Sequence, residues 1–194
     1  MSGAVAPGDN EFHDVVQMAV ASGASPPKLR RKWVNADVDG THVSGVAWGK
    51  GSPELVLLHG AGESARRYDR VGLATTRPLV AIDLPGHGQS SWRRDGRYRP
   101  EQLAGPLAAA IRSFAPGAKA VVGTGLGGLA AIAVAVRHPL QVRNLVLVDT
   151  VPSVDPAGGV PTDLPESFAT KEELLSLAPR LSASAGRSEL ILRS

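Results

Sequence analysis

Four short, unbroken runs of apolar residues limit the possible folds of this 194-residue chain more than any other feature. Each run ends in glycine or aspartate, which favour turns. Unbroken apolar runs are typical of strands covered on both faces, as in a parallel sheet. Segments with apolar residues at helical spacing separate the runs, so we expect an α/β fold: a mostly parallel sheet flanked by helices and joined by right-handed crossovers. With the polar and turn residues that flank them, the runs span residues 54–60, 78–88, 119–123 and 144–149.

Four segments have the spacing of helices, and one segment reads as a hairpin. The first helix should end near Gly23, and residues 32–49 should form two strands with Asp39 and Gly40 at the turn. Pro100 suits the first turn of the third helix, whereas Pro106 does not suit a helix interior. We therefore expect a kink or a late start there. The helical segments are residues 11–24, 67–76, 100–115 and 126–138.

Composition excludes several classes of site. The chain has no cysteine, which rules out disulfides, thiolate metal sites and cysteine nucleophiles. Its net charge of +3 comes from scattered arginines without a basic stripe, so we expect no nucleic acid partner. The apolar run 129–136 is too short to span a bilayer, and Asp9 and Glu11 stand where a secretory signal would be basic. We expect a cytoplasmic protein without a metal, a cofactor or a membrane segment.

A glycine cluster between the third run and the following helix permits two hypotheses. Gly123, Gly125 and Gly128 form the pattern G-x-G-x-x-G, and Asp149 follows about twenty residues later at the end of the next predicted strand. This arrangement is typical of dinucleotide binding, in which the glycines let the backbone approach a pyrophosphate and the acid binds a ribose hydroxyl. A dinucleotide site normally lies in the first strand–helix–strand unit of a fold. Here, however, two buried strands precede the unit that contains the glycines.

The second hypothesis comes from four blocks taken together. Residues 57–65 (LLHGAGESA), 81–90 (AIDLPGHGQS), 123–128 (GTGLGG) and 145–153 (LVLVDTVPS) occur in this order at suitable intervals. From about Trp33 to Phe168 the chain resembles the α/β-hydrolase family, and is most similar to small esterase-like members with an HG-x-G segment.

In that family the glycine turn is the nucleophile elbow, G-x-S-x-G. Here the pattern falls on Gly123 to Gly127, and Gly125 occupies the position of the serine. Glycine preserves a strained turn while deleting the hydroxyl group. The substitution also creates the G-x-G-x-x-G pattern automatically, and we do not expect Thr124 to replace the serine.

The resemblance also implies an oxyanion hole made of the backbone N–H groups of Ala61 and Leu126, with Gly60 beside them. His59 and His87 are expected to support loop geometry. The family places its general-base histidine after a late strand, but no histidine follows His138 in this sequence.

Asp149 is the candidate acid, although an equally good reading is a carboxylate that anchors the loop. Without a nucleophile and a base, we expect an esterase-like protein that is catalytically impaired. A non-enzymatic protein that binds a small ester or carboxylate, a dinucleotide binder and a truncated remnant are the alternatives.

The resemblance divides the chain into three parts. Residues 1–32 are an N-terminal helix and linker, residues 33–153 an incomplete hydrolase core, and residues 154–194 a partial cap segment and tail, in which Thr170 and Glu173 form a capping box. The strand 143–149 would then be an apolar sheet edge, through which the protein could associate with itself.

Overall fold

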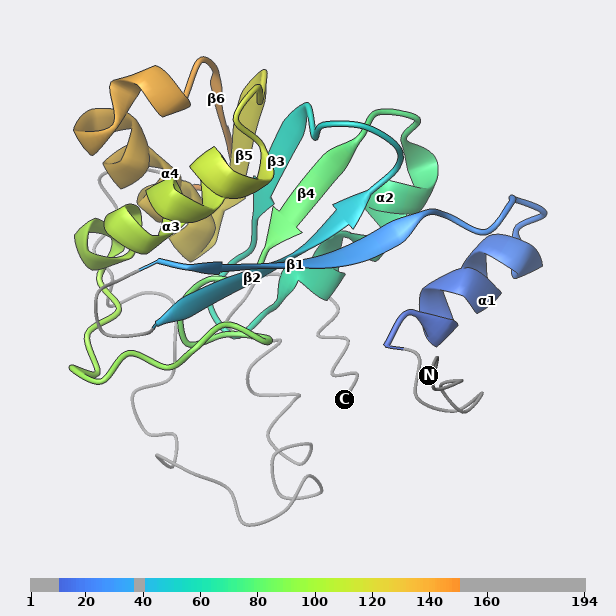
Figure 1. Ribbon diagram of the computed structural model, residues 1–194, viewed down its shortest axis with the longest axis horizontal. Coiled ribbons are helices and arrows are strands. Elements are labelled where there is room, and N and C mark those ends of the chain that lie inside the picture. The colour runs from blue at the N-terminus through green and yellow to red at the C-terminus, as the bar shows by residue number, and fades with distance from the viewer. Residues whose placement is uncertain (1–10, 37–40, 151–194) are drawn as a thin grey trace, which may run out of the picture. The chain divides into compact units, whose positions relative to one another are not determined.

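A computed structural model describes residues 11–36 and 41–150 of the chain (Figure 1). The described strands form one sheet in the order β1-β2-β4-β3-β5-β6. Strand β2 is antiparallel to β1 and β4, and the remaining neighbours are parallel, as the sequence predicts. The strands are β1 (Leu29–Asn35), β2 (His42–Trp48), β3 (Leu55–Leu58), β4 (Leu79–Ile82), β5 (Ala120–Thr124) and β6 (Leu145–Val148).

Helices cover both faces of the sheet, which explains the unbroken apolar strands. Helices α3 and α4 cover one face, where their apolar residues pack against Val43, Val56 and Val80 (Figure 1). Helix α1 and the η1 turn contribute to a second core with Trp48 and Leu57 on the other face. The helical elements are α1 (His13–Ala21), η1 (Ala65–Tyr68), α2 (Asp69–Ala74), α3 (Pro100–Phe114), α4 (Gly125–Arg137) and η2 (Pro139–Gln141).

The register of the parallel strands brings three loops to one edge of the sheet. Leu55 of β3 pairs with Leu79 and Ala120 where the three strands begin, and Leu58 pairs with Ile82 and Gly123 where they end. The segments that follow β3, β4 and β5 therefore leave the sheet side by side. These segments contain the HG-x-G block, the PGHG block and the glycine turn.

Helix α3 differs from the prediction in one respect. It starts at Pro100 and contains Pro106 within its 15 residues, so the late start is wrong. Proline lacks the N–H that would donate to the carbonyl oxygen of Gln102. That oxygen instead accepts a hydrogen bond from Nη1 of Arg93 at 3.3 Å. A side chain from the preceding loop thus occupies the backbone acceptor that the proline leaves free.

Some predictions fall on residues that the structure does not describe. These are the hairpin turn at Asp39 and Gly40, the boundary after residue 153, the cap segment and the capping box of Thr170. Strand β6 is last in the sheet order, and its Val146 and Val148 are 44% and 47% exposed. Self-association through this edge stays a prediction. Among the described helices, none is long and apolar enough to cross a membrane.

Candidate functional site

The glycine turn joins β5 directly to α4, with Thr124 ending the strand and Gly125 beginning the helix. Gly125 has a φ of +49°, in the left-handed region that favours glycine. Among the described atoms outside its own helix and chain neighbours, a Cβ atom built at this position would meet only the Cα atom of Gly60, at 3.7 Å, which is ordinary van der Waals contact. The turn therefore has the backbone conformation of a sharp elbow and the space for a side chain that glycine does not provide.

The neighbouring glycines have a different role, because they permit close packing. A Cβ at Gly127 would lie 2.4 Å from the carbonyl oxygens of Leu58 and His59, and one at Gly123 would lie 2.6 Å from that of Gly127. A Cβ at Gly128 would clash with the side chain of Thr150. Close packing at the start of α4 accounts for Gly123 and Gly128 of the G-x-G-x-x-G pattern. Dinucleotide binding through this pattern stays a prediction.

Thr124 directs its hydroxyl group into the protein. Its Oγ1 lies 3.4 Å from the hydroxyl of Tyr68, which donates a 2.8 Å hydrogen bond to the carbonyl oxygen of Leu58. Burial, the largest cause, raises the pKa of Tyr68 above its usual value. Sequence reasoning did not identify Tyr68, because its partners lie 10 and 56 residues away and leave no local pattern.

The loop after β3 lies against the elbow and is held by two side chains. The N–H of Gly60 donates to Oε2 of Glu63 at 2.9 Å, and the N–H of Gly62 donates to Nε2 of His87 at 3.1 Å. Ala61 lies between these tethered residues and is exposed. The structure thus brings Gly60, at the start of the HG-x-G loop, to the elbow. Glu63 is a second site residue that sequence reasoning did not identify.

His59 is fully buried and anchors the same loop from inside. Its Nδ1 donates to the carbonyl oxygen of Gly60 at 2.7 Å, and its Nε2 accepts the N–H of Leu84 at 3.0 Å. One donor and one acceptor suit the neutral ring with its proton on Nδ1. Burial, the largest cause, lowers the pKa of His59 to about 4. These contacts are those of a loop-anchoring side chain.

Stability should therefore decrease with acid in a defined window. The pKa of His59 is about 4 when folded, against a usual value of 6.5. Between these two pH values the unfolded chain binds more protons than the folded one. The contribution of His59 to the free energy of unfolding is therefore complete above pH 6.5 and decreases as the pH falls toward 4. The total change in the free energy of unfolding is about 3 kcal/mol. Urea unfolding from pH 7.5 to 4.5 would measure it. His59→Gln, which keeps an acceptor for Leu84, should flatten the profile, and an unchanged profile would contradict this assignment.

The other predicted residues are placed as follows. Asp149 follows β6, is exposed and has a φ of +51°, the only positive value among the described non-glycine residues. Leu126 is in the first turn of α4, where backbone N–H groups have no partner within the helix. His138 follows the last residue of α4, about 20 Å from the elbow at 1.5 Å per residue, which is too far for a base.

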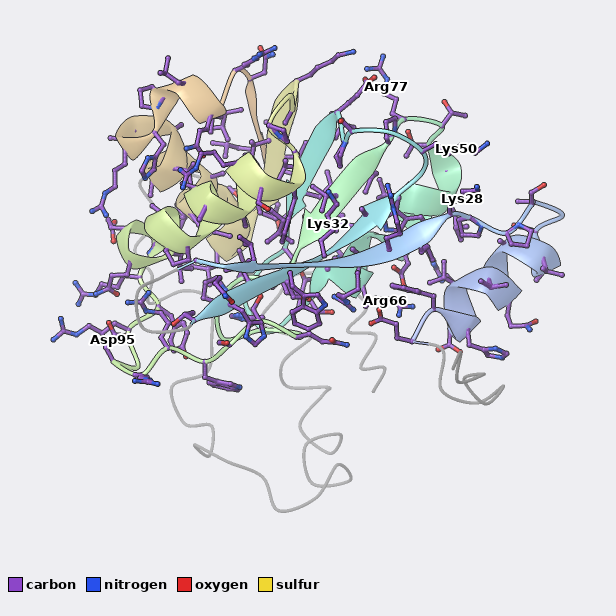
Figure 2. The ribbon with its side chains drawn as sticks, viewed as in Figure 1. Lys28, Lys32, Lys50, Arg66, Arg77 and Asp95 are labelled. Carbon is purple, nitrogen blue, oxygen red and sulfur yellow. The ribbon has the colours of Figure 1, made fainter. Side chains whose placement is uncertain are left out.

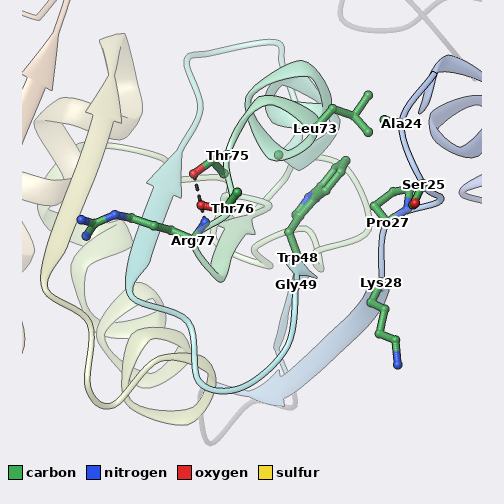
Figure 3. Close-up of a pocket in the computed structure, with 11 residues that line it drawn as sticks. Ala24, Ser25, Pro27, Lys28, Trp48, Gly49, Leu73, Thr75, Thr76 and Arg77 are labelled. Atoms are coloured by element: carbon green, nitrogen blue, oxygen red, sulfur yellow. Dashed lines mark hydrogen bonds between the residues drawn. The ribbon is translucent and has the colours of Figure 1, made fainter. Parts of the chain in front are cut away.

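One described cavity lies away from the elbow. It measures about 200 Å³ and is lined by Ser25, Trp48, Leu73 and Thr76, at the edge of the sheet where β4 begins (Figure 3). The side chains of Lys28 and Arg77 lead away from Trp48 (Figure 3). This cavity is at the opposite end of the strands from the elbow.

Among the described residues, no group of three histidines and carboxylates is placed to hold a metal.

Comparisons with known proteins agree with this geometry. The esterase Rv0045c of Mycobacterium tuberculosis is 41% identical over 146 residues, which cover 75% of this chain and 48% of that protein. A crystal structure of that esterase has 40% identity and a TM-score of 0.67, with 77% of this chain and 52% of that chain covered. The pimeloyl-[acyl-carrier protein] methyl ester esterase of Klebsiella pneumoniae (strain 342) is 36% identical over 130 residues, covering 66% and 48%.

The chain spans about half the length of these relatives. The model described as "Alpha/beta hydrolase family" matches residues 55–192, which include the HG-x-G loop, the PGHG block and the glycine turn. The sheet order, the elbow between β5 and α4 and these matches agree with one another, and the chain belongs to the α/β-hydrolase family.

Proposed function

We propose that this chain contains the ester-binding part of a hydrolase site without its nucleophile, and that it binds a small carboxylic ester or carboxylate without hydrolysing it efficiently. The observation that carries the proposal is Gly125, whose φ of +49° and open surroundings fit an elbow from which only the side chain is missing. Serine hydrolysis needs a hydroxyl, a base and an acid that orients the base. The sequence lacks the first at this position.

All five histidines of the given sequence lie in its described part, so their contacts can be compared with those expected of a base. His59 is buried with both ring nitrogens engaged, and His87 has Nδ1 on the carbonyl oxygen of Pro85 and Nε2 on the N–H of Gly62. His42 contacts Gln89 and Ser91. His138 is at the far end of α4, and His13 is at the start of α1.

The backbone donors are the part of the site that remains. Ala61 is exposed between two tethered glycines, and Leu126 is in the first turn of α4, where the helix dipole favours negative charge. Two such N–H groups can hold a carbonyl oxygen or a carboxylate. Asp149 is our candidate for a residual acid, because a non-glycine residue in the left-handed region marks strain of the kind found at functional sites.

The names of two similar proteins support an ester or carboxylate as the ligand. Two of the proteins to which the chain is similar are named as esterases, and one of them as a methyl ester esterase. An ester or carboxylate is therefore the first ligand to test.

Binding can be tested by NMR of the ¹⁵N-labelled chain titrated with butyrate and with ethyl butyrate. The amide signals of Ala61 and Leu126 should move together and saturate. The amide of Gly105 serves as the control. This residue lies on α3, and no described atom outside its own helix backbone and chain neighbours lies within 4 Å of a Cβ built there. If the two donor amides stay unchanged at saturating concentrations of both ligands, the proposed function is wrong.

Activity can be tested by restoring the hydroxyl. Gly125→Ser should hydrolyse p-nitrophenyl butyrate less than about tenfold faster than Gly125→Ala, since a hydroxyl without a base is a weak nucleophile. Both variants force a side chain into the left-handed region at a cost of about 1–2 kcal/mol, so their comparison isolates the hydroxyl. Burst kinetics and a fluorophosphonate adduct on the serine variant would show that one of the histidines acts as a base.

A further inference from the structure

A loop between β4 and α3, residues 92–99, carries a concentration of positive charge that the hydrolase site does not use. Its sequence is WRRDGRYR. Arg94, Arg97 and Arg99 are exposed, and none of them forms an ion pair with a described carboxylate. The loop's one acid, Asp95, accepts hydrogen bonds from Nε and Nη2 of Arg93 at 3.0 and 2.8 Å. Four arginines and one aspartate therefore give residues 92–99 a net charge of +3.

Asp95 offsets only one of the loop's four positive charges. The hydrogen bonds from Arg93 are the largest cause that holds the pKa of Asp95 at about 2, and the backbone N–H of Arg97 adds to the effect. The carboxylate stays ionised and remains engaged with Arg93 and the turn. Figure 2 shows Asp95 at the periphery of the described chain.

Hydrogen bonds at both ends hold the loop against its surroundings. The N–H of Arg93 donates to the hydroxyl of Tyr98 at 2.8 Å, and the N–H of Arg99 donates to Oε1 of Gln102 at 3.1 Å. Nη1 of Arg93 reaches the carbonyl oxygen of Gln102, which Pro106 leaves free. A surface ordered before binding loses less conformational entropy when a partner docks.

Trp92 adds an apolar anchor to the charged loop. Its side chain is 77% exposed, and its ring meets that of Tyr98 edge to face at 6.4 Å. Tryptophan, tyrosine and arginine are the residues that most often dominate the binding energy of protein interfaces. An exposed tryptophan beside three exposed arginines therefore has the composition of an interface centre.

We propose that residues 92–99 form a docking surface for an acidic protein, with Arg94, Arg97 and Arg99 facing its carboxylates and Trp92 packing on an apolar residue among them. The loop follows β4 at the same edge of the sheet as the elbow, so the partner would dock at this edge. A nucleic acid fits less well, because its regular phosphates call for a longer basic stripe. An anionic membrane fits less well, because the loop is not an amphipathic helix.

The probe for this surface is a fluorescein-labelled peptide of about 20 residues composed of glutamate, aspartate and leucine, titrated with the whole chain. We expect saturable binding that weakens with salt. Replacing Arg94, Arg97 and Arg99 together with glutamine should lower the affinity at least about tenfold, and Trp92→Ala should lower it severalfold. The matched control replaces the exposed Arg30, Arg70 and Arg143 with glutamine. It changes the net charge equally and should lower the affinity less than about threefold.

Four results would overturn the proposal. They are absence of peptide binding, equal losses in the two triple variants, tighter binding of an oligothymidylate of similar length, and tighter binding to vesicles that contain phosphatidylserine. None of these measurements involves an ester, so they are independent of the function proposed for the elbow.

Discussion

Replacing Gly127 with alanine is expected to destabilise the described domain by about 3 kcal/mol or more. The new Cβ would lie 2.4 Å from the carbonyl oxygens of Leu58 and His59. These are backbone atoms at the end of β3, so they cannot rotate away as a flexible side chain would. Helix α4 would have to move off the sheet, or β3 would have to move together with the loop that contains Gly60.

The matched control for this variant is Gly105→Ala. Gly105 is in the interior of α3, and no described atom outside its own helix backbone and chain neighbours lies within 4 Å of a Cβ built there. Alanine there should stabilise the protein by about 1 kcal/mol, since it has a higher helix propensity than glycine. Urea unfolding of the two variants should therefore give changes of opposite sign. Equal changes would mean that α4 does not approach β3 as closely as described.

A second large effect is expected at the ion pair between Arg31 and Asp83. Nη1 of Arg31 lies 2.9 Å from Oδ2 of Asp83, and the side chains are 12% and 2% exposed. Asp83 also accepts hydrogen bonds from the hydroxyl of Ser44 at 2.9 Å and from the N–H of Ala65 at 2.7 Å. One carboxylate therefore connects β1, β2 and the start of η1 to the end of β4.

Arg31→Met should lower the free energy of unfolding by about 3 kcal/mol or more, because it leaves a buried carboxylate without its counter-ion. The exposed pair between Arg77 and Glu54 provides the comparison, with side chains 61% and 31% exposed. Arg77→Met should change stability by less than about 1 kcal/mol. If Arg31→Met also costs less than about 1 kcal/mol, the neutral hydrogen-bond donors around Asp83 stabilise its carboxylate without the arginine.

The strands and the elbow could be predicted from sequence because their signals are local. An apolar run such as residues 54–60 predicts a strand that is buried on both faces. A glycine at the centre of a strand-to-helix turn predicts the left-handed conformation that Gly125 adopts. Whether the N–H groups of Ala61 and Leu126 bind an oxyanion stays a prediction. The placement of Gly60 next to Gly125 is what makes it testable.

The contacts that support the site could not be predicted in the same way. Arg31 and Asp83 are 52 residues apart in sequence, and Gly62 and His87 are 25 apart. Such pairs follow from strand order and register, which a single sequence does not specify. Helix α3 shows a related difficulty, because the propensity of Pro106 argues against a helix interior and tertiary contacts override it.

The irregularity at Pro106 makes α3 an attachment point for the loop before it. An alanine at this position would contribute an amide proton, which would compete with the guanidinium of Arg93 for the oxygen of Gln102. A helix with this backbone hydrogen bond restored would then hold residues 92–99 less firmly. The loop 92–99 is thus anchored at the position where α3 lacks one backbone hydrogen bond. A substitution that completes the hydrogen bonding of α3 would weaken the attachment of the loop.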